Sequence, residues 1–465
     1  MDKFDVVVIG GGPGGYPAAI RAAQLGASVA VVEKERIGGT CLNWGCIPTK
    51  ALIASAEVFH RALHAGSFGV KVASASFDYT AMNTRKDAVV DKLRGGVQQL
   101  LKGNGVKVFE GTAAFTARNR VAISSPDGVV PLEARRTIIA TGSESSMPGF
   151  IPASPRVVES RGFLNLKALP ASLIVLGGGV IGCEFACMAA NLGTKVTIVE
   201  LLDDILVMLD RDVRQVLRRH MEEDLKIRIL TGKPLEGIQA GASGASGRFG
   251  DESLDAELLL VSVGRRPVTR GLDLGKAGIE ATAKGAIPID EFCSTRAAGV
   301  FAVGDVTEGS TQLAHAATSQ GITAAENALQ PAPAKAEKII PSCIFTSPEI
   351  GAAGMSEEKA KASGRNVKTG KFAFAALGRA MAVGETAGFV KWVVDADTDQ
   401  LLGASAVGAH ATELIAEAAL AIRSELTAAE VARTVHNHPT FSEAWMEAAD
   451  AVHGACIHAA PRRKT

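Results

Sequence analysis

The sequence has few aromatic residues, no net charge and no long apolar run. Aromatic residues make up 5% of the 465 residues, whereas glycine occurs 50 times, which suits an α/β protein with many tight backbone turns. The formal net charge is +0 and no long basic run occurs, so we expect no nucleic-acid partner. No apolar stretch approaches the roughly 20 residues of a membrane span, and we expect no membrane partner.

The N-terminus shows no targeting pattern. The residues from Met1 onward lead directly into a predicted strand, without the features of a signal or transit peptide. We therefore expect a cytoplasmic location. The 7 cysteines, in such a reducing compartment, argue against a structural disulfide framework. We expect no metal site.

A repeated pattern of strand, turn and helix organises the chain. Strands are predicted at 4–10 and 29–32 around a helix at 18–25, and the same order recurs from residue 173 to residue 200. Each copy has Gly-x-Gly-x-x-Gly between strand and helix, and an acid ends each second strand. These landmarks, which recur at a constant offset, are Gly10, Gly12, Gly15 and Glu33, and then Gly177, Gly179, Gly182 and Glu200.

The doubled fingerprint predicts two dinucleotide sites. The first glycine makes the turn, the second lets the backbone approach pyrophosphate, the third lets helix meet strand, and the acid accepts from a ribose hydroxyl. Backbone N–H groups at the helix N-terminus bind the phosphates. Glycines that only punctuate a turn are the alternative, and the repeat argues against it. Pro17 falls about one turn into the first helix, where we expect an altered helix start rather than a lost site.

Two cysteines after the first fingerprint predict a redox pair. In a regular helix, Cys41 and Cys46 would have Cα atoms roughly 8–9 Å apart, whereas a disulfide needs about 7 Å or less. The segment must therefore bend, and Gly45 and Pro48 provide the means. So short a loop gains little stability from a disulfide, and electron exchange is the expected use. Coincidence or two buried thiols are the alternatives for a bare Cys-x-x-x-x-Cys.

A second motif, His-Asn-His-Pro-Thr-Phe-Ser-Glu, occupies residues 436–443. Pro439 favours an extended backbone at His438, so that its imidazole projects from a connector. Glu443 lies on the helix that follows. Thr440 and Glu443 also match a capping box, in which Glu443 would only hold the start of the helix. His436 is expected to be a surface or helix-end histidine.

These motifs resemble those of the flavin disulfide reductases, the class I pyridine nucleotide-disulfide oxidoreductase family. The segment Cys-Leu-Asn-Trp-Gly-Cys-Ile-Pro-Thr-Lys is most similar to the dihydrolipoamide dehydrogenase branch, and the similarity extends over nearly the whole chain. The resemblance implies that Cys41 exchanges with a dithiol substrate and that Cys46 contacts the flavin. It also implies that His438 accepts protons and that Glu443 orients it, as a carboxylate does in a catalytic triad.

The resemblance further implies two cofactors, FAD and NAD. Lys50 and Glu184 would form an ion pair beside the flavin, with a surface salt bridge or no contact as the alternative. Asp305 would lie on the ribityl chain. The expected FAD residues are Gly10, Gly12, Pro13, Gly14, Gly15, Glu33, Thr40, Lys50, Ala113, Thr141, Gly142, Ser143, Asp305, Leu313, Ala314 and His315. The expected NAD residues are Gly177, Gly179, Val180, Ile181, Gly182, Glu184, Glu200 and Gly264.

The implied fold class is α/β, with two Rossmann-like FAD/NAD(P)-binding domains and a C-terminal α+β dimerisation domain. We expect an FAD-binding domain at 1–147, an NAD-binding domain at 148–267, a return segment that completes the FAD side at 268–337, and an interface domain at 338–465. The segment 241–250, rich in Gly, Ala and Ser, is expected to be a loose hairpin tip.

The expected reaction is oxidation of protein-bound dihydrolipoamide through the Cys41–Cys46 disulfide and FAD, with the hydride passing to NAD. Expected partners are a second copy, in a homodimer whose active sites are shared between chains, and lipoyl domains of 2-oxoacid dehydrogenase or glycine cleavage complexes. Glutathione reductases have a different sequence around their redox cysteines and bind NADP through arginines. Neither feature is found in this chain. Mercuric reductases carry a C-terminal cysteine pair, whereas Cys456 stands alone. A redox sensor without turnover would need no dedicated base such as His438.

Overall fold

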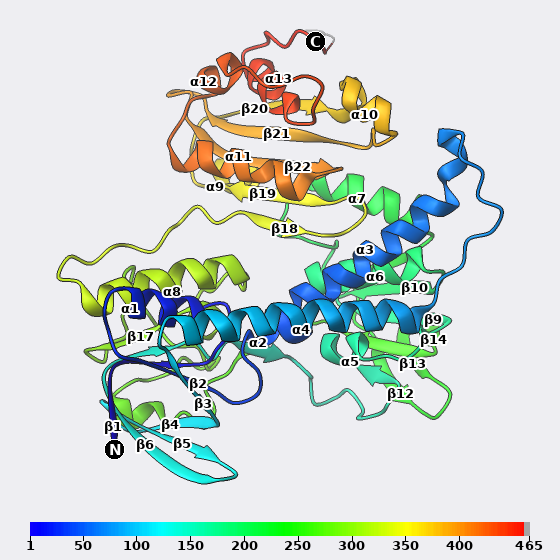
Figure 1. The fold of residues 1–465 in the computed structure, drawn as a ribbon. Helices are drawn as coiled ribbons and strands as arrows, with labels where there is room; N and C mark the ends of the chain where they lie inside the picture. The colour runs from blue at the N-terminus through cyan, green and yellow to red at the C-terminus, as the bar shows by residue number, and fades with distance from the viewer. Residues whose placement is uncertain (460–465) are drawn as a thin grey trace.

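The computed structural model describes residues 1–459; residues 460–465, at the end of the expected interface domain, lie outside the described residues. The chain forms three lobes, and the C-terminal lobe lies above the other two in Figure 1. The first lobe is built on a mixed sheet whose β4-β5-β6 part is antiparallel, the second on a parallel sheet and the third on an antiparallel sheet. The predicted α/β class, with two Rossmann-like halves and a C-terminal α+β unit, is confirmed. Within residues 1–459, no helix is both long and apolar enough to cross a membrane.

The first sheet presents the first fingerprint at the carboxyl end of its central strand. Its order is β3-β2-β1-β6-β5-β4, and β17 also pairs with β6. Four successive residues at the end of β1 are buried, as expected for a parallel strand covered on both faces. The strands are β1 (Asp2–Ile9), β2 (Val29–Glu33), β3 (Lys107–Glu110), β4 (Thr112–Ala117), β5 (Arg120–Ser125), β6 (Gly128–Ile139) and β17 (Val300–Ala302).

The second sheet repeats this arrangement in the order β11-β10-β9-β15-β8, and all its pairs are parallel. A two-stranded ribbon, β7 with β16, connects the two nucleotide-binding lobes. An antiparallel meander, β12-β13-β14, packs beside the second sheet. The strands are β7 (Ser143–Ser145), β8 (Val157–Val158), β9 (Ser172–Leu176), β10 (Lys195–Glu200), β11 (Arg228–Thr231), β12 (Glu236–Ala240), β13 (Ala245–Phe249), β14 (Glu252–Ala256), β15 (Leu258–Val261) and β16 (Arg265–Pro267).

The expectation of a loose hairpin tip over 241–250 is wrong for half of its length. Residues 245–249 form β13, which pairs with both β12 and β14. Alternate residues of β13 are buried in the core beside the second sheet, so burial overrides the flexible composition. The turn is confined to residues 241–244.

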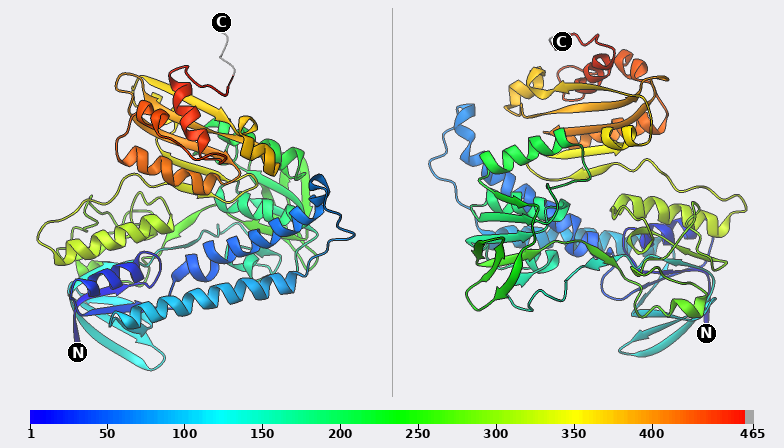
Figure 2. Two further views of the ribbon diagram at one scale, coloured as in Figure 1. Left: turned by 45° about the horizontal axis from the view of Figure 1, so that its top comes forward. Right: turned by 180° about the vertical axis from the view of Figure 1, so that it is seen from behind.

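Two long helices cross from the first lobe to the second, as Figures 1 and 2 show. They are α3 and α4, and α3 packs on α6 of the second lobe. In the first lobe, α1 and α8 lie side by side. The helices of these two lobes are α1 (Gly15–Gln24), α2 (Gly39–Trp44), α3 (Cys46–Leu63), α4 (Tyr79–Gly103), α5 (Ser160–Leu164), α6 (Val180–Asn191), α7 (Arg211–Glu223) and α8 (Ala314–Leu329). Short 3₁₀ turns occupy Ala65–Phe68, Leu274–Ala277 and Gly304–Val306.

The third lobe has an antiparallel sheet in the order β18-β19-β22-β21-β20. Its core includes Trp392 and Trp445, whose ring centroids lie 4.6 Å apart, and the Trp392 indole donates to the Trp445 carbonyl. The elements are β18 (Ser342–Ile344), β19 (Ile350–Gly354), α9 (Glu357–Ala362), β20 (Val367–Ala373), a 3₁₀ turn (Phe374–Ala376), α10 (Gly378–Val383), β21 (Gly388–Asp395), β22 (Leu401–Gly408), α11 (Ala411–Arg423), α12 (Ala428–Arg433) and α13 (Glu443–Val452).

A buried ionic cluster fixes the third lobe to the second. The Lys391 ammonium lies 2.9 Å from Asp210, 2.8 Å from Asp212 and 3.3 Å from Glu357. Asp210 and Asp212 stand at the start of α7, whereas Lys391 and Glu357 belong to the third lobe. A charge this deeply buried requires such partners, and the cluster therefore sets the position of the third lobe over the nucleotide-binding lobes.

Candidate functional site

The first and third glycines of each fingerprint are required by close backbone contacts. A Cβ on Gly15 would lie 1.8 Å from the Gly10 carbonyl oxygen, and one on Gly182 would lie 2.0 Å from that of Gly177. Gly10 and Gly177 adopt φ of +105° and +112°, a region that favours glycine. A side chain at Gly15 or Gly182 would push helix and strand apart, and one at Gly10 or Gly177 would collide with the carbonyl oxygen of Ala140 or Ser262.

The second glycines leave space in front of a helix N-terminus. No heavy atom lies within 4 Å of a Cβ built on Gly179, and the nearest to one on Gly12 is 3.6 Å away. Helices α1 and α6 begin just beyond these loops, with Val180 and Ile181 in the first turn of α6. Their backbone N–H groups and dipoles suit a pyrophosphate, so both loops fit a dinucleotide. Pro17 is the third residue of α1, where a missing N–H leaves the helix intact.

The acid of each fingerprint also supports its own loop. Glu33 accepts the Gly11 N–H at 2.8 Å, and Glu200 accepts the Gly178 N–H at 2.6 Å. Each carboxylate accepts a second N–H two residues further along, at 2.8 Å in both copies. A cavity of about 710 Å³ lies beside Glu33, between the end of β2 and α4. The carboxylates are therefore fixed at the place where the ribose of a bound dinucleotide is expected.

The turn after β6 is held by an arginine that sequence reasoning missed. Arg265 donates from Nε to the Ser143 hydroxyl and from Nη2 to the Ser143 carbonyl, both at 2.7 Å. The Ser143 hydroxyl donates to Asp305 at 2.6 Å, and the Thr141 hydroxyl donates to the Val268 carbonyl at 2.6 Å. Arg265 lies in β16, opposite β7, three residues before the predicted return segment begins at 268. Its place at that predicted boundary was the available signal.

The other expected cofactor residues lie around the same edges. Leu313 caps α8, Ala314 and His315 begin it, and the His315 Nε2 lies 2.6 Å from the Pro341 carbonyl. Helix α8 also contacts the glycine loop, because the hydroxyl of Thr318, its fifth residue, donates to the Pro13 carbonyl at 2.9 Å. The remaining positions are Thr40 in α2, Ala113 buried in β4, and Gly14, Gly142 and Gly264 in turns.

The two cysteines of the redox motif lie on either side of a helix break. Helix α2 ends at Trp44, Gly45 adopts φ −135° and ψ −113°, and α3 begins at Cys46. The predicted bend at Gly45 is therefore confirmed. Both cysteines are free thiols; Cys41 is half-buried and Cys46 is exposed.

The two thiols have unequal acidity. The Cys41 thiol donates a hydrogen bond to Cys46, and this bond, together with the charge of Lys50, lowers the pKa of Cys46 to about 7. The same bond and burial raise the pKa of Cys41, because its proton is needed for the bond. In the reduced pair, Cys46 is therefore the sulfur that carries the negative charge.

Lys50 and Glu184 form an ion pair that joins the lobes. The ammonium lies 2.7 Å from the Glu184 carboxylate, whose side chain is 5% exposed. Glu184 also accepts the backbone N–H of Phe345 at 2.9 Å, and the Lys50 ammonium lies 4.7 Å from the centre of the Phe345 ring. The buried carboxylate thus has two donors, one from α3 and one from the third lobe.

The residues between the two cysteines are held from outside the motif. The Arg161 guanidinium, from α5, lies 4.0 Å from the centre of the Trp44 ring and 3.0 Å from Glu35. The Asn43 amide donates to the carbonyls of Ile37, before α2, and Gly39, the first residue of α2, both at 3.0 Å, and it accepts from Arg94 at 3.2 Å. Cation–π contacts contribute roughly 0.5–2 kcal/mol. Neither arginine was identifiable from sequence, because both lie far along the chain.

His438 and Glu443 form the pair that their motif suggested. The His438 Nδ1 lies 2.9 Å from Glu443 Oε1, and the imidazole is 75% exposed. The second Glu443 oxygen accepts the Thr440 N–H at 2.8 Å. One Glu443 oxygen therefore orients the histidine while the other holds the backbone just before α13. The full capping box is not formed, because the Thr440 hydroxyl donates to the Asn437 carbonyl and the N-cap residue, Ser442, has no side-chain cap bond. Since Glu443 only accepts, Nδ1 carries the proton and Nε2 presents the lone pair.

The expectation for His436 is wrong. Its side chain is only 5% exposed, and Nε2 lies 2.7 Å from Glu417 on α11. Nδ1 lies 2.8 Å from the Thr434 carbonyl. His436 is buried against α11, where its partner Glu417 lies 19 residues earlier in the chain. No local sequence pattern could therefore reveal its burial.

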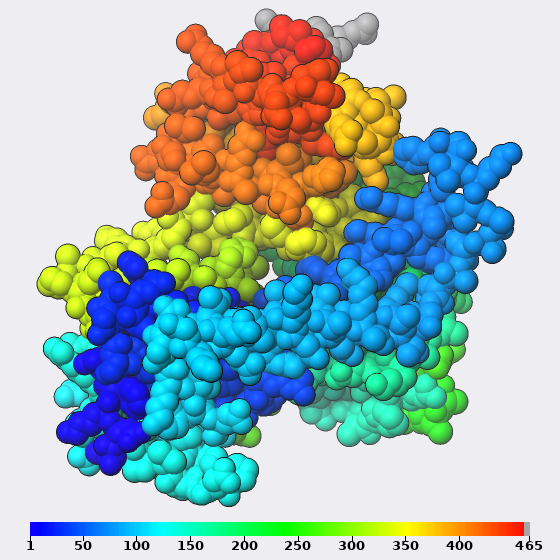
Figure 3. All heavy atoms as spheres, in the orientation of Figure 1, coloured from blue at the N-terminus to red at the C-terminus, as the bar shows by residue number. Residues whose placement is uncertain are grey.

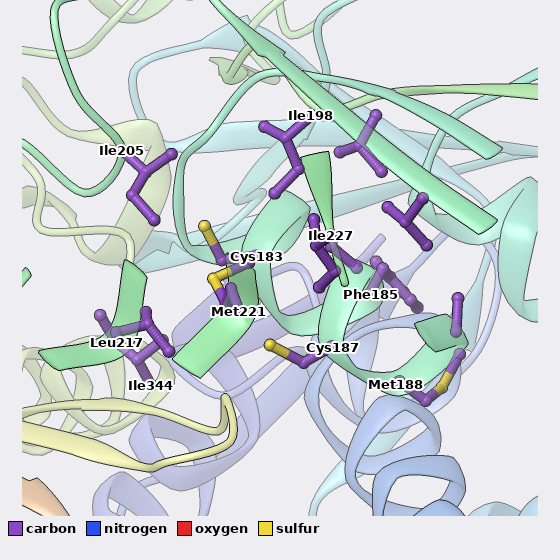
Figure 4. Close-up of a cluster of buried hydrophobic side chains, with 14 of the residues drawn as sticks. Cys183, Phe185, Cys187, Met188, Ile198, Ile205, Leu217, Met221, Ile227 and Ile344 are labelled. Carbon is purple, nitrogen blue, oxygen red and sulfur yellow. The ribbon is translucent and has the colours of Figure 1, made fainter. Parts of the chain in front are cut away.

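The remaining cysteines are structural or peripheral. Figure 4 shows Cys183 and Cys187 among apolar side chains, and burial raises the pKa of Cys187 to about 12. Cys293 is buried, and Cys343 packs against the core of the third lobe. Cys456 donates to Glu447 at 3.0 Å. Within residues 1–459, no group of three or more His, Cys, Asp and Glu side chains is placed to hold a metal ion.

The histidine pair and the cysteine pair belong to different lobes. The cysteines lie at the junction of α2 and α3, whereas the exposed His438 lies on the third lobe, whose orange and red residues Figure 3 shows above α4. Among the described residues, no hydrogen bond or ion pair joins His438 to Cys41 or Cys46. Within one chain, the expected base, His438, is thus separated from the expected redox pair, Cys41 and Cys46.

Two family models match the chain. Residues 4–321 match the pyridine nucleotide-disulphide oxidoreductase family, and residues 340–449 match the dimerisation domain of that family. Three curated relatives named dihydrolipoyl dehydrogenase come from Chlamydia muridarum, Bacillus subtilis and Thermus scotoductus. The first is 40% identical over 100% of both chains, and the other two are each 42% identical over 98% of this chain and 99% of their own.

Solved structures agree with this assignment. LpdA from Mycobacterium tuberculosis superposes with a TM-score of 0.90 at 27% identity, covering 97% of this chain and 99% of its own. The flavoprotein disulfide reductase RclA from Escherichia coli, induced by HOCl and solved as a Cu(II) complex, has a TM-score of 0.87 at 30% identity over 97% and 99% of the two chains. Two fingerprints, the Cys41–Cys46 pair and a match to the dimerisation domain occur together in this chain, and the chain belongs to the pyridine nucleotide-disulphide oxidoreductase family.

Proposed function

We propose that this protein is a dihydrolipoyl dehydrogenase, which oxidises dihydrolipoamide to lipoamide and reduces NAD to NADH. The observation that carries the proposal is the pair of free thiols Cys41 and Cys46 at a helix break directly after the first fingerprint. FAD, bound on that fingerprint, supplies the two-electron carrier between the dithiol and NAD on the second fingerprint.

The sulfur exchange follows from the acidities of the two thiols. A substrate thiolate attacks the Cys41 sulfur of the oxidised pair, the Cys41–Cys46 bond breaks, and Cys46 leaves as the thiolate that its lowered pKa favours. The second substrate thiol then attacks the substrate sulfur of the mixed disulfide, which releases Cys41 and closes the lipoamide disulfide. Two electrons and two protons leave the substrate; the electrons and one proton end in NADH, and the other proton is released to solvent.

His438 is the base for the substrate thiols. Because Glu443 holds Nδ1–H at 2.9 Å, Nε2 is available to accept the proton of an attacking thiol. His438 is 75% exposed in one chain. Two apolar side chains are also exposed: Val435, three residues earlier, by 93%, and Leu420, on α11, by 64%. We propose that a second copy covers this surface, and that His438 of one chain faces the cysteines of the other.

The substrate is presented by another protein. Lipoyl domains of 2-oxoacid dehydrogenase or glycine cleavage complexes, in the cytoplasm, are the partners proposed to carry the dithiol arm. The sulfur that the substrate attacks, Cys41, is half-buried, and a dithiol on a long arm can extend to such a sulfur.

The direct test is NADH formation from dihydrolipoamide by the purified, yellow holoenzyme. We expect turnover with dihydrolipoamide and NAD, and little with reduced glutathione or with NADP as acceptor. A preference for glutathione and NADPH would make the protein a glutathione-type reductase. NADH-dependent reduction of Hg(II) without dihydrolipoamide oxidation would instead indicate mercuric chemistry.

Coenzyme choice should depend on Glu200. Its carboxylate would repel the 2′-phosphate of NADP and accept from the free ribose hydroxyl of NAD. Glu200→Gln removes the charge and keeps an acceptor for the Gly178 N–H. We expect the ratio of kcat/KM for NAD to that for NADP to fall about tenfold, which corresponds to about 1.4 kcal/mol. Glu222→Gln, at the far end of α7, is the control; an unchanged ratio in Glu200→Gln would refute the role.

A further inference from the structure

His436 lies two residues before the proposed base, on the connector between α12 and α13. Its side chain is 5% exposed, although the residues on both sides of it, Val435 and Asn437, are exposed. The ring is anchored at both nitrogens, with Nε2 2.7 Å from the Glu417 carboxylate and Nδ1 2.8 Å from the Thr434 carbonyl. The connector is therefore fixed to α11 at this point.

Both partners of the ring can only accept hydrogen bonds. A neutral imidazole carries one N–H and can satisfy one of them, whereas the imidazolium cation satisfies both. The hydrogen bond that Glu417 on α11 accepts from the ring, the one accepted by the Thr434 carbonyl, and the charge of Glu443 on α13 raise the pKa of His436 against burial. Arg433, at the end of α12, is exposed. His436 is accordingly held as a cation over a wider pH range than a free histidine.

The proposed base lies between two fixed points. On one side, His436 ties the connector to α11; on the other, Glu443 accepts from His438 and from the Thr440 N–H. The Thr440 hydroxyl also donates to the Asn437 carbonyl at 2.7 Å. Between these points His438 is 75% exposed, so contacts of its own chain hold only its Nδ1 side. Loss of the His436 anchor would free the N-terminal half of the connector.

We propose that His436, as an imidazolium bound to Glu417, is a positioning residue that holds the connector so that His438 Nε2 meets the substrate thiol. This inference rests on the proposed dithiol oxidation. The anchor is complete while His436 is protonated. It is lost as pH rises through its raised pKa, because one of the two hydrogen bonds then has no donor. Dithiol oxidation should therefore decline at alkaline pH for a reason that lies outside the reacting groups.

The test compares Glu417→Gln with Asp399→Asn in the holoenzyme. Glu417→Gln keeps an acceptor for Nε2–H but removes the charge, so we expect the alkaline limb of the kcat profile for dihydrolipoamide to move about one pH unit lower. Asp399→Asn, which removes the carboxylate 3.2 Å from His453 in the same lobe, should leave the profile unchanged. His436→Gln should lower kcat about tenfold with little change in the KM for NAD.

Two further measurements separate positioning from general damage. Ferricyanide reduction by NADH, which bypasses the cysteines and His438, should be unchanged in both Glu417 and His436 variants. Deuterium exchange at the imidazole C2–H, followed by mass spectrometry, should show the His436 pKa above its ordinary value of about 6.5 in the unmutated protein and lower in Glu417→Gln. An unmoved alkaline limb, an unmoved His436 pKa, or an equal loss of ferricyanide activity would overturn the inference. If the unmutated enzyme does not oxidise dihydrolipoamide, the proposed function itself fails.

Discussion

Serine in place of either Cys41 or Cys46 should lower dihydrolipoamide oxidation by on the order of a thousand-fold or more, because both sulfurs are needed for exchange. The two variants should differ in colour. After two-electron reduction, the unmutated enzyme and Cys41→Ser should show a long-wavelength band from the Cys46 thiolate against the flavin, whereas Cys46→Ser should lack it. Absorption spectra under anaerobic titration measure the difference.

The same band should respond to pH. Since the pKa of Cys46 is lowered to about 7, the thiolate is present above that pH, and the band of the reduced unmutated enzyme should fade as the pH drops through about 7. In Cys41→Ser, serine replaces the thiol donor, and the band should fade at a different pH. Cys456→Ser, a distant thiol, is the control and should behave as the unmutated protein does. A band that persists in Cys46→Ser would reverse the roles assigned to the two sulfurs.

About a quarter of unmutated activity should return when Cys46→Ser and His438→Gln chains, each nearly inactive, are unfolded and refolded together. Random pairing of equal amounts makes about half of the dimers mixed. If His438 serves the cysteines of the other chain, each mixed dimer has one doubly damaged site and one intact site. The dihydrolipoamide assay on the refolded mixture, corrected for recovered FAD, gives the fraction.

A matched mixture shows whether recovery depends on the shared site. Cys41→Ser refolded with Cys46→Ser damages the same half of every site, so this mixture should remain inactive. If the first mixture also remains inactive although mixed dimers are present, His438 serves its own chain. The two-chain site would then be wrong, while the chemistry of Cys41 and Cys46 would stand.

Local geometry was the part of the molecule that sequence could predict well. Positive φ at Gly10 and the break at Gly45 are imposed by neighbouring residues, so the glycine pattern located both. The same holds for the acid at the end of each fingerprint strand. The acid also supports the glycine loop by accepting backbone N–H groups. This second role was not evident, because the sequence pattern indicates only that the acid binds the ribose of the dinucleotide.

Features made by distant segments could not be predicted in the same way. The burial of His436 is decided by α11, and the hold on Trp44 is decided by Arg161 in another lobe. In neither pair are the two residues separated in the sequence by a distance that a single strand or helix would bring together. The strand at 245–249 was missed for a related reason, since its small residues form a strand only because neighbouring strands and a core receive them.

The contacts of Glu184 restrict how the chain could be recombined with its relatives. One carboxylate in the second lobe accepts from Lys50 of the first lobe and from the Phe345 backbone of the third, while the Phe345 ring covers the Lys50 ammonium. A chimera that takes any one lobe from another parent must therefore import a residue that completes this junction. Grafts that shift the backbone at 345, or place a proline there, would leave a buried carboxylate short of a donor. Although each lobe has its own sheet, the three lobes therefore cannot be exchanged independently of one another.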